Sequence, residues 1–208
     1  LRLYQPLMNK FLGSVDRIVS TSPSYLKSSK TLAKFRDKVS VIPIGLDKST
    51  YSAANKERLE YWQKKFGNKF FLFIGVLRYY KGLHILIEAA CNSDYLIIIV
   101  GAGPIEKELK DQVRNLGINN IYFVGFVSDE DKVALFTLSY AILLPSHLRS
   151  EAFGISLLEG AMHGKPLISC EIGTGTTYIN IDGKTGVVVP PSNPEALRKA
   201  MDYLWNNP

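Results

Sequence analysis

The sequence lacks the features that assign many proteins to a class at once. It has two cysteines and three histidines among 208 residues, and none of them has the spacing of metal ligands. No apolar stretch approaches the ~18 unbroken residues of a membrane span. The first residues, LRLYQPLMNKFLG, have neither the apolar core nor the cleavage site of a signal peptide. We therefore expect no metal site and no membrane-spanning segment.

Long runs of basic residues are also missing. Lysine and arginine number 25 against 19 acidic residues, which gives a net charge of +6, but no run is longer than a pair such as Lys64–Lys65. A nucleic acid, an anionic membrane or a phosphorylated small molecule could each explain the excess. No motif of a nucleic-acid module is present, so we expect no nucleic-acid partner. We interpret the excess as spread over a solvated surface, which is compatible with peripheral membrane association.

The two cysteines, Cys91 and Cys170, follow an apolar helix pattern and an apolar strand. We interpret them as small buried residues in a reducing compartment. A cytoplasmic location is therefore expected, and attachment at the inner face of the cytoplasmic membrane is compatible with the basic charge.

Six short apolar runs follow one another from residue 70 onward. Each is bounded by glycine or proline and is apolar throughout rather than alternating, which is typical of strands buried on both faces of a parallel sheet. The runs are 70–76, 95–101, 121–125, 141–145, 166–169 and 186–190.

Amphipathic helical patterns separate these strands. The first helix places Leu83, Leu86, Ile87 and Ala90 on one stripe, and the second does the same with Ile105, Leu109, Val113 and Leu116. Ser128 and Asn193 are expected to cap two later helices. The alternation predicts right-handed βαβ units and a doubly wound, Rossmann-like α/β domain. The predicted helices are 82–91, 105–116, 129–138, 155–163 and 194–205.

Residues 1–50 differ from the rest of the chain. They contain two apolar strands, in RIVSTSPSYLKS and KVSVIPIGLD, with no third strand beside them. The sequence also begins with leucine rather than methionine, so we expect residues 1–50 to be the remnant of a preceding α/β domain in a longer protein. Residues 51–69 are polar and helix-compatible, and we expect a linker there. Residues 70–208 would form the second domain.

Ligands of an open parallel sheet bind at the carboxyl ends of the strands, so the residues after each strand are candidates. Arg78 and Lys81 follow the first of these strands and precede a helix. Such cations can bind phosphate oxygens beside the amides that open the helix. Two surface cations in a loop would show the same pattern.

Two further loops carry glycines and one aromatic ring. Gly101-Ala102-Gly103-Pro104 opens a helix but lacks the third glycine of a dinucleotide fingerprint, and a tight turn with close backbone packing would explain it. Gly125-Phe126-Val127-Ser128 could offer an edge to a nucleobase, but the pattern of a core phenylalanine before a capped helix is the more usual one.

The densest polar segment lies between residues 145 and 159. Glu151 lies in the loop, the amides of 153–156 open a helix, and Glu159 is on that helix. Helix amides bind anions, whereas carboxylates accept hydrogen bonds from sugar hydroxyls. The pattern therefore suits a molecule with both a diphosphate and sugars, although a capped helix with one solvated glutamate remains an alternative.

These segments together resemble one known family. VIPIGLD at 41–47, the Arg78-x-x-Lys81-Gly82 loop, the GAGP turn, EAFGISLLE at 151–159 and GKPLISCEIGTGTTYINIDGKTGVVVPPSNPEAL at 164–197 follow in the same order. This order resembles that of retaining GT-B glycosyltransferases of the glycosyl transferases group 1 family, and is closest to bacterial mannosyltransferase-like members. The resemblance runs from about Asp16 to the end. One departure is Ile44, where the family often has asparagine.

The resemblance implies a donor site on this half of a GT-B fold. Arg78 and Lys81 would bind the donor diphosphate, Glu151 the donor sugar and Glu159 the ribose hydroxyls. Arg78, Lys81 and Glu151 would be the catalytic residues. The remaining donor-binding residues would be Gly75, Gly101, Gly103, Val127, Phe153, Gly154 and Ile155, with no metal and no cofactor.

The resemblance further implies transfer of a hexose, with retention of configuration. Mannose from GDP-mannose is the expected donor, a glycan or lipid-linked sugar the acceptor, and surface polysaccharide or lipopolysaccharide the product. Residues 1–208 alone would bind nucleotide weakly and catalyse nothing. A nucleotide-sugar epimerase and a non-catalytic nucleotide-sugar-binding module remain alternatives.

Overall fold

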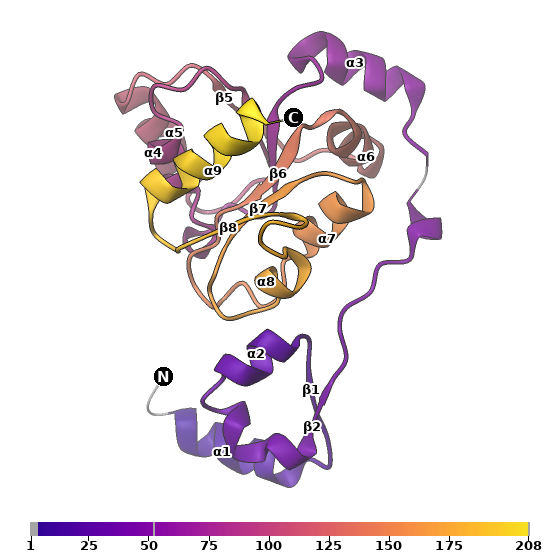
Figure 1. The fold of residues 1–208 in the computed structure, drawn as a ribbon, viewed down its shortest axis with the longest axis vertical. Helices are drawn as coiled ribbons and strands as arrows, with labels where there is room; N and C mark the ends of the chain where they lie inside the picture. The colour runs from indigo at the N-terminus through magenta and orange to yellow at the C-terminus, as the bar shows by residue number, and fades with distance from the viewer. Residues whose placement is uncertain (1–3, 52, 208) are drawn as a thin grey trace.

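Six parallel strands form one central sheet (Figure 1). The computed structural model describes residues 4–51 and 53–207. The strand order is β5-β4-β3-β6-β7-β8, which confirms the predicted doubly wound α/β fold. The strands are β3 (Phe71–Ile74), β4 (Ile97–Val100), β5 (Ile121–Gly125), β6 (Ala141–Leu144), β7 (Leu167–Cys170) and β8 (Gly186–Val189).

The central strands are apolar along their length because both of their faces are covered. Every residue of β4 and β6 is buried. β3 and β4 pair in register from Phe71 with Ile97 to Ile74 with Val100, so that large side chains stack in layers across the sheet. This burial explains why the strands read as continuous apolar runs in the sequence.

Helices cover the two faces of the sheet (Figure 1). Helices α4, α5 and α9 pack together on one face, and α6, α7 and α8 lie on the other. None of the described helices is long and apolar enough to span a lipid bilayer. Their bounds are α4 (Leu83–Ala89), α5 (Glu106–Asn115), α6 (Asp129–Leu138), α7 (Ile155–Met162), α8 (Thr176–Ile179) and α9 (Pro194–Asn206).

The predicted caps begin two of these helices. Ser128 Oγ accepts a hydrogen bond from the Asp131 amide at 3.2 Å, and Asn193 Oδ1 accepts one from the Ala196 amide at 2.9 Å. Such caps satisfy amides that have no partner inside the helix. Both cap predictions are therefore confirmed.

Two burial predictions are wrong. Leu116, expected on the buried stripe of α5, is 44% exposed, because the helix ends at Asn115 and the chain turns at Gly117 with a φ of +64°. Cys91 is only partly buried, because it lies beyond the end of α4. Cys170 is buried as predicted, and its burial raises the pKa of the thiol to about 12.

The N-terminal segment forms a small separate layer at the bottom of Figure 1. Its strands β1 (Ile18–Ser20) and β2 (Val39–Val41) pair in parallel, and among the described residues no third strand joins them. Several apolar side chains of this segment are exposed, for example Phe11 and Ile42. The other elements are α1 (Gln5–Ser14), α2 (Pro23–Ser28), η2 (Leu32–Lys38) and η3 (Lys48–Thr50).

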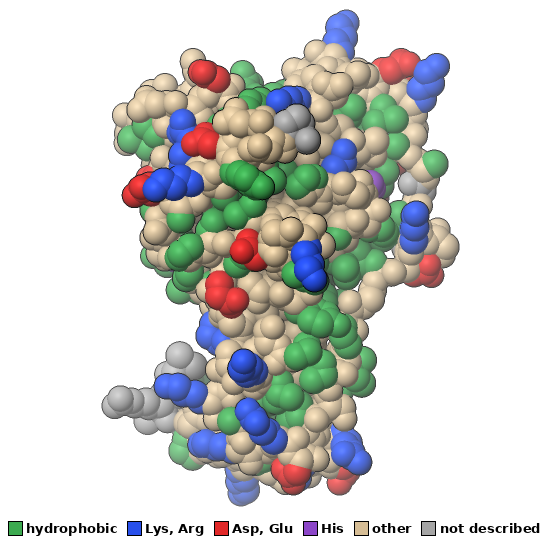
Figure 2. Space-filling view, in the orientation of Figure 1, with side chains coloured by type: hydrophobic (Ala, Val, Ile, Leu, Met, Phe, Trp, Pro, Cys, Tyr) green, Lys and Arg blue, Asp and Glu red, His purple; other side chains and the backbone are tan. Residues whose placement is uncertain are grey.

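The basic excess is concentrated in this segment. Residues 1–50 contain nine lysines and arginines against three aspartates, whereas residues 51–208 contain 16 basic and 16 acidic side chains. The whole net charge of +6 therefore lies in residues 1–50, and Figure 2 shows basic side chains gathered on this lower part of the molecule. The expectation that the basic excess is spread over the surface is therefore wrong. The absence of long basic runs does not show which part of the chain carries the excess.

The predicted linker contains helix α3 (Lys56–Phe66), which packs against α6. Trp62 of α3 belongs to the main hydrophobic core and donates its indole N–H to Asp131 at 2.7 Å. Arg58 also binds Asp131, with Nη2 at 2.5 Å. This helix is therefore fixed to the sheet domain by buried contacts, and the domain boundaries remain a prediction.

Candidate functional site

The strand order reverses between β3 and β6, the two central neighbours of the sheet. The chain passes from β3 to β4 and β5 on one side and then returns to β6, β7 and β8 on the other. In open α/β sheets such a reversal opens a crevice at the carboxyl ends of the strands, where ligands bind. The loops that follow β3 and β6 carry Arg78, Lys81 and Glu151, so the topology brings the three predicted catalytic residues to this crevice.

The loop after β3 folds into a short 3-10 turn, η4 (Tyr79–Lys81). Gly82 follows with a φ of +71° and begins α4. A Cβ atom on Gly82 would lie only 2.1 Å from the carbonyl oxygen of Pro145, in the loop after β6. Glycine is therefore required for the two loops to approach each other this closely, and this approach carries the basic turn into the crevice.

Lys81 and Glu151 form an ion pair between the loops that follow β3 and β6. Lys81 Nζ lies 2.5 Å from Glu151 Oε2, and the two side chains are only 12% and 10% exposed. Ser146 donates its hydroxyl to the same carboxylate oxygen at 3.1 Å. The pair is separated by 70 positions in the sequence, so the fold places a cation and a carboxylate in direct contact where each was predicted to bind a different part of one ligand.

Arg78 lies at the start of the turn with its side chain exposed. None of the salt bridges found among the described residues involves Arg78. A planar guanidinium in this position can bind phosphate oxygens through two parallel hydrogen bonds. Arg78 and Lys81 therefore differ in their surroundings: one is solvated, and the other is buried and paired.

The loop after β6 leads into the first turn of α7. Gly154 has a φ of +96° and provides no side-chain cap, so no side chain accepts from the first amides of the helix. Phe153 is buried, and a Cβ atom on Gly175 would lie 2.5 Å from its ring. Ile155 is 48% exposed. Phe153 and Gly154 thus determine the path of the backbone into α7. The uncapped amides at the start of this helix are groups that can bind an anion.

Glu159 is more buried than Glu151, with 6% of its surface exposed against 8%. Its Oε1 accepts hydrogen bonds from Tyr51 Oη at 3.0 Å and lies 3.0 Å from Lys132 Nζ. Burial acts to lower the pKa of Lys132, but the hydrogen bond and the charge of Glu159 outweigh it, so the pKa is raised. Lys132 therefore stays charged and fixes this carboxylate on α7.

Sequence reasoning missed Lys132 and Tyr51. A cation in the first turn of a helix is unfavourable because of the helix dipole, and Lys132 occupies that position in α6. This position could have indicated that Lys132 binds a carboxylate elsewhere in the fold. Tyr51 carried no comparable signal, because it lies in an irregular part of the predicted linker and reaches Glu159 from 108 positions away.

Gly101 and Gly103, in the loop after β4, lie close to the backbone of Gly75 and Leu77, in the loop after β3. A Cβ atom on Gly101 would lie 2.1 Å from the carbonyl oxygen of Gly75, and one on Gly103 would lie 2.3 Å from that of Leu77. The interpretation of the GAGP turn as close backbone packing is therefore confirmed. A role in donor binding stays a prediction for all three glycines.

Phe126 follows β5 and is 90% exposed, so the expectation of a core phenylalanine is wrong. Gly125 has a φ of +73°, and the chain turns there so that the next side chain faces solvent. Val127 is partly buried and packs against the core. Val127, and not Phe126, therefore packs against the core, and the exposed ring of Phe126 lies beyond the carboxyl end of β5.

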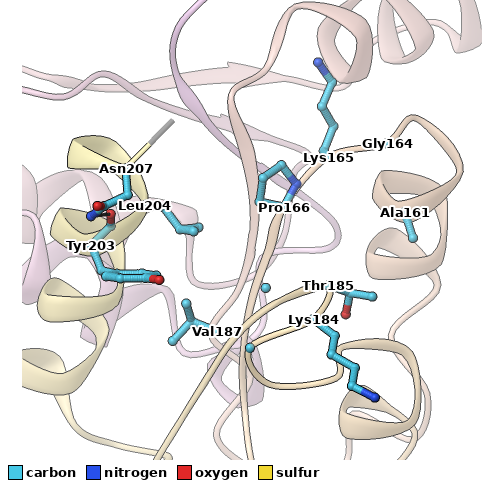
Figure 3. Close-up of a pocket in the computed structure, with 12 residues that line it drawn as sticks. Ala161, Gly164, Lys165, Pro166, Lys184, Thr185, Val187, Tyr203, Leu204 and Asn207 are labelled. Carbon is cyan, nitrogen blue, oxygen red and sulfur yellow. Dashed lines mark hydrogen bonds between the residues drawn. The ribbon is translucent and has the colours of Figure 1, made fainter.

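The structure also shows a pocket of about 460 Å³ at the opposite end of the sheet (Figure 3). Its walls include Tyr203 and Leu204 of α9. The amines of Lys165 and Lys184 point away from its centre (Figure 3), and Lys165 donates to the carbonyl of Thr137 at 2.8 Å. The pocket therefore has no converging charges and lies apart from the predicted site. No group of three or more metal-ligating side chains was found in the described part of the chain.

Comparisons with known proteins point to one family. Residues 55–208 match the family model described as Glycosyl transferases group 1. The chain is 61% identical over 208 residues to the D-rhamnosyltransferase WbpZ of Pseudomonas aeruginosa, covering 100% of this chain and 55% of that protein. It is 52% identical over 207 residues to the O-antigen chain mannosyltransferase C of Escherichia coli, covering 100% and 56%. The chain thus spans about half the length of these curated relatives.

Solved structures show the same fold. The chain is similar to Anabaena Alr3699/HepE, solved in complex with UDP and glucose, with a TM-score of 0.81, 22% identity, and coverage of 99% of this chain and 57% of that one. It is also similar to the sucrose-phosphate synthase of Thermosynechococcus elongatus, with a TM-score of 0.83, 19% identity, and coverage of 100% and 53%. At these identities the likeness concerns the fold alone.

Proposed function

Because the chain belongs to the glycosyl transferases group 1 family, we propose that it forms the half of a glycosyltransferase that binds a nucleotide-sugar donor. The observation that carries this proposal is the Lys81–Glu151 pair at the point of strand reversal. The pair is a buried cation and a buried carboxylate in the segments that precede α4 and α7. This supports the proposal, because a donor contains both a diphosphate and sugar hydroxyls.

The chemistry assigned to each group follows from its charge. Departure of the nucleoside diphosphate develops negative charge, which Arg78 and Lys81 would stabilise together with the first amides of α7. Glu151 would accept hydrogen bonds from the donor sugar, and Glu159 from the ribose hydroxyls. A metal ion is not required for this charge stabilisation. The configuration of the transferred sugar would be retained, as the family resemblance implies.

The names of the relatives support the choice of donor and product. One is a D-rhamnosyltransferase and the other an O-antigen chain mannosyltransferase. D-rhamnose is the 6-deoxy form of D-mannose, so both names describe hexoses that differ by a single hydroxyl. We therefore propose a GDP-linked hexose of this type, mannose being the first choice, as the donor, and a glycan or lipid-linked sugar of O-antigen or lipopolysaccharide synthesis as the acceptor.

A cytoplasmic enzyme at the membrane surface would suit a lipid-linked acceptor. The net charge of +6 in residues 1–50 supports electrostatic attraction of this segment to anionic lipids. Sedimentation with vesicles of anionic and of neutral lipid would test this part of the proposal. Equal binding to both kinds of vesicle would contradict it.

The proposed function is tested by measuring binding of GDP, UDP and ADP, and of their sugars, to the 208-residue chain by calorimetry. We expect binding of GDP-mannose to the wild type. Lys81→Met and Arg78→Met are each expected to weaken it by about tenfold or more, the scale of losing a charge-assisted hydrogen bond. Lys184→Met serves as a matched control, because Lys184 is exposed at the opposite end of the sheet.

Transfer is tested in the longer protein that carries these residues. Glu151→Ala and Lys81→Ala are each expected to lower the transfer rate by at least ~10²-fold, on the scale of losing a preorganised group. Unchanged transfer would indicate a non-catalytic module, and release of an epimerised donor would indicate an epimerase. Failure of every nucleotide sugar to bind the folded chain would refute the donor-site proposal.

A further inference from the structure

A cluster of three aromatic rings lies beside the basic turn η4. Tyr79 stacks on His84, with ring centroids 4.9 Å apart and planes 7° from parallel. His147 meets both rings edge-on, at 4.9 Å from Tyr79 and 5.1 Å from His84. The three residues come from η4, from α4 and from the loop after β6, so this ring cluster joins the two loops that form the crevice.

His147 binds the turn through two hydrogen bonds. Its backbone amide donates to the carbonyl of Tyr80 at 3.0 Å, and its ring Nε2 lies 3.1 Å from the carbonyl of Tyr79. Because a carbonyl oxygen can only accept, Nε2 must carry the hydrogen. The other ring nitrogen, Nδ1, lies 3.0 Å from Ser192 Oγ, which holds the ring in the orientation that points Nε2 at the turn.

The turn depends on such contacts from outside. A 3-10 turn of three residues has little stability of its own. Its internal bonds are those from Lys81 N to Arg78 O and from Gly82 N to Tyr79 O, at 3.0 and 3.1 Å. His147 is largely buried and binds two successive carbonyls of the turn from the neighbouring loop. His147 therefore contributes two of the contacts that hold the turn from outside, one from its ring and one from its backbone amide.

We propose that His147 is a positioning residue that fixes the η4 turn so that Arg78 and Lys81 meet the donor diphosphate. This inference rests on the proposed function of the crevice. His147 would touch no part of the donor. Its ring would act through the carbonyl of Tyr79, and this is the bond that a substitution of the side chain removes, because the bond to the Tyr80 carbonyl comes from the backbone amide. Its loss should weaken binding of the diphosphate more than binding of the base and ribose, which other loops hold.

His84 provides a matched control. Its Nδ1 is buried without a hydrogen-bond partner, and no hydrogen bond joins its ring to the turn in the described part of the chain. Burial, and then the proximity of His147, lowers the pKa of His84, which favours the neutral ring that stacks on Tyr79. A change of His84 to Phe therefore keeps the stacking on Tyr79 and removes no bond to η4.

The test compares nucleoside diphosphates with monophosphates. Affinities of GDP, GMP, UDP and UMP for the 208-residue chain are measured by calorimetry for the wild type, His147→Phe, His147→Gln and His84→Phe. We expect His147→Phe to reduce the diphosphate-to-monophosphate affinity ratio by about tenfold, which corresponds to a misplaced cation or to the loss of one charge-assisted bond. His147→Gln keeps an amide donor and should restore part of the ratio, and His84→Phe should leave it unchanged.

Each other outcome overturns the inference in a recognisable way. Equal weakening of diphosphates and monophosphates by His147→Phe would assign His147 a purely structural role. An unchanged ratio would show that the turn does not need it. If the wild type itself shows no preference for diphosphates, the proposed function fails, and this failure is seen before any substitution is made. Should His147→Phe not fold, Ser192→Ala carries the test, because it frees Nδ1 and should lower the ratio in the same direction by a smaller factor.

Discussion

At the scale of single residues, the candidate site combines two buried ion pairs with the exposed Arg78. Lys81 contacts Glu151, and Lys132 contacts Glu159. A buried charge is costly unless it has a partner. Lys81, Glu151 and Glu159 therefore each have a charged protein partner, whereas Arg78 is exposed.

The Lys81–Glu151 pair allows a stability prediction. Lys81→Met and Glu151→Gln each leave one buried group without its partner, so each is expected to lower the free energy of unfolding by about 3–5 kcal/mol. The double variant removes both groups and should lose less than the sum, with a coupling of about 0.5–3 kcal/mol. Urea unfolding of the four proteins measures this cycle. Losses that add without coupling would contradict the buried pair.

Glu159 gives a second prediction at this scale. Glu159→Gln is expected to weaken binding of GDP or UDP by about tenfold, because hydrogen bonds to a charged carboxylate contribute about 1.5–3 kcal/mol. Binding of the 2′-deoxynucleotides should weaken less, since they lack one of the hydroxyls that Glu159 would hold. Calorimetry measures both. Glu88→Gln on the exposed side of α4 is the control, and an equal loss for both kinds of nucleotide would exclude a ribose contact.

At the scale of secondary-structure elements, α3 is held to α6 by one buried carboxylate. Asp131 accepts from Trp62 at 2.7 Å, from Ser128 at 2.8 Å and from Arg58 Nε at 2.5 Å. Burial acts to raise the pKa of Asp131, but these hydrogen bonds and the charge of Arg58 outweigh it and lower the pKa. The same residue thus completes the N-terminal cap of α6 and fixes the preceding helix.

Asp131→Asn is expected to lower the free energy of unfolding by about 2–4 kcal/mol, because Arg58 and Trp62 lose their charged acceptor. The midpoint of thermal unfolding should fall by about 5–15 °C, as measured by circular dichroism. Asp129→Asn, at an exposed position of the same helical turn, should cost less than about 1 kcal/mol. Similar effects of the two changes would contradict the assigned role of Asp131.

The pH dependence of this difference has a definite sign. The pKa of Asp131 is lower in the folded chain than its ordinary value of 3.8. Its contribution is therefore fully present above the ordinary pKa and is lost as the pH falls through the folded pKa. The difference in stability between the wild type and Asp131→Asn should be largest near neutral pH and shrink in acid. A difference in stability that grows in acid would contradict a lowered pKa of Asp131 in the folded chain.

At the scale of the whole molecule, the two parts of the chain differ in their burial. In the described residues up to 47, the buried apolar side chains are Ile18 and Leu32, whereas the main core belongs to the sheet domain. Arg149 joins the parts: its Nη1 donates to Ser28 Oγ at 2.7 Å and to the carbonyl of Gly173 at 2.8 Å. Its guanidinium also lies 5.1 Å from the ring centroid of Tyr25.

Hydrogen exchange should show this difference. Amides of residues 4–47 are expected to exchange well before those of β3, β4 and β6, because few buried apolar contacts hold that segment. Arg149→Ala should accelerate exchange in α2 further and leave the central strands unchanged. Arg114→Ala, on an exposed part of α5, is the control. Equal protection of both parts of the chain would contradict this difference.

The sequence by itself determined the six strands of the main sheet, the helices α4, α5, α6, α7 and α9, and the family. Short continuous apolar runs bounded by glycine or proline are typical of strands covered on both faces. The caps Ser128 and Asn193 act within a few residues of their own position, so these features are local. The segment EAFGISLLE and the Arg78–Lys81 loop could be identified for the same reason, since their residues and spacing lie within short stretches.

Only the tertiary structure decided which residues meet. Lys81 and Glu151 pair because β3 and β6 are neighbours in the sheet, although 70 positions separate them. Lys132 and Tyr51 reach Glu159 from different elements, and His147 binds η4 from the opposite loop. The exposure of Phe126 depends on the turn at Gly125. Such contacts follow from strand order and backbone direction, which a linear pattern of residue types does not contain.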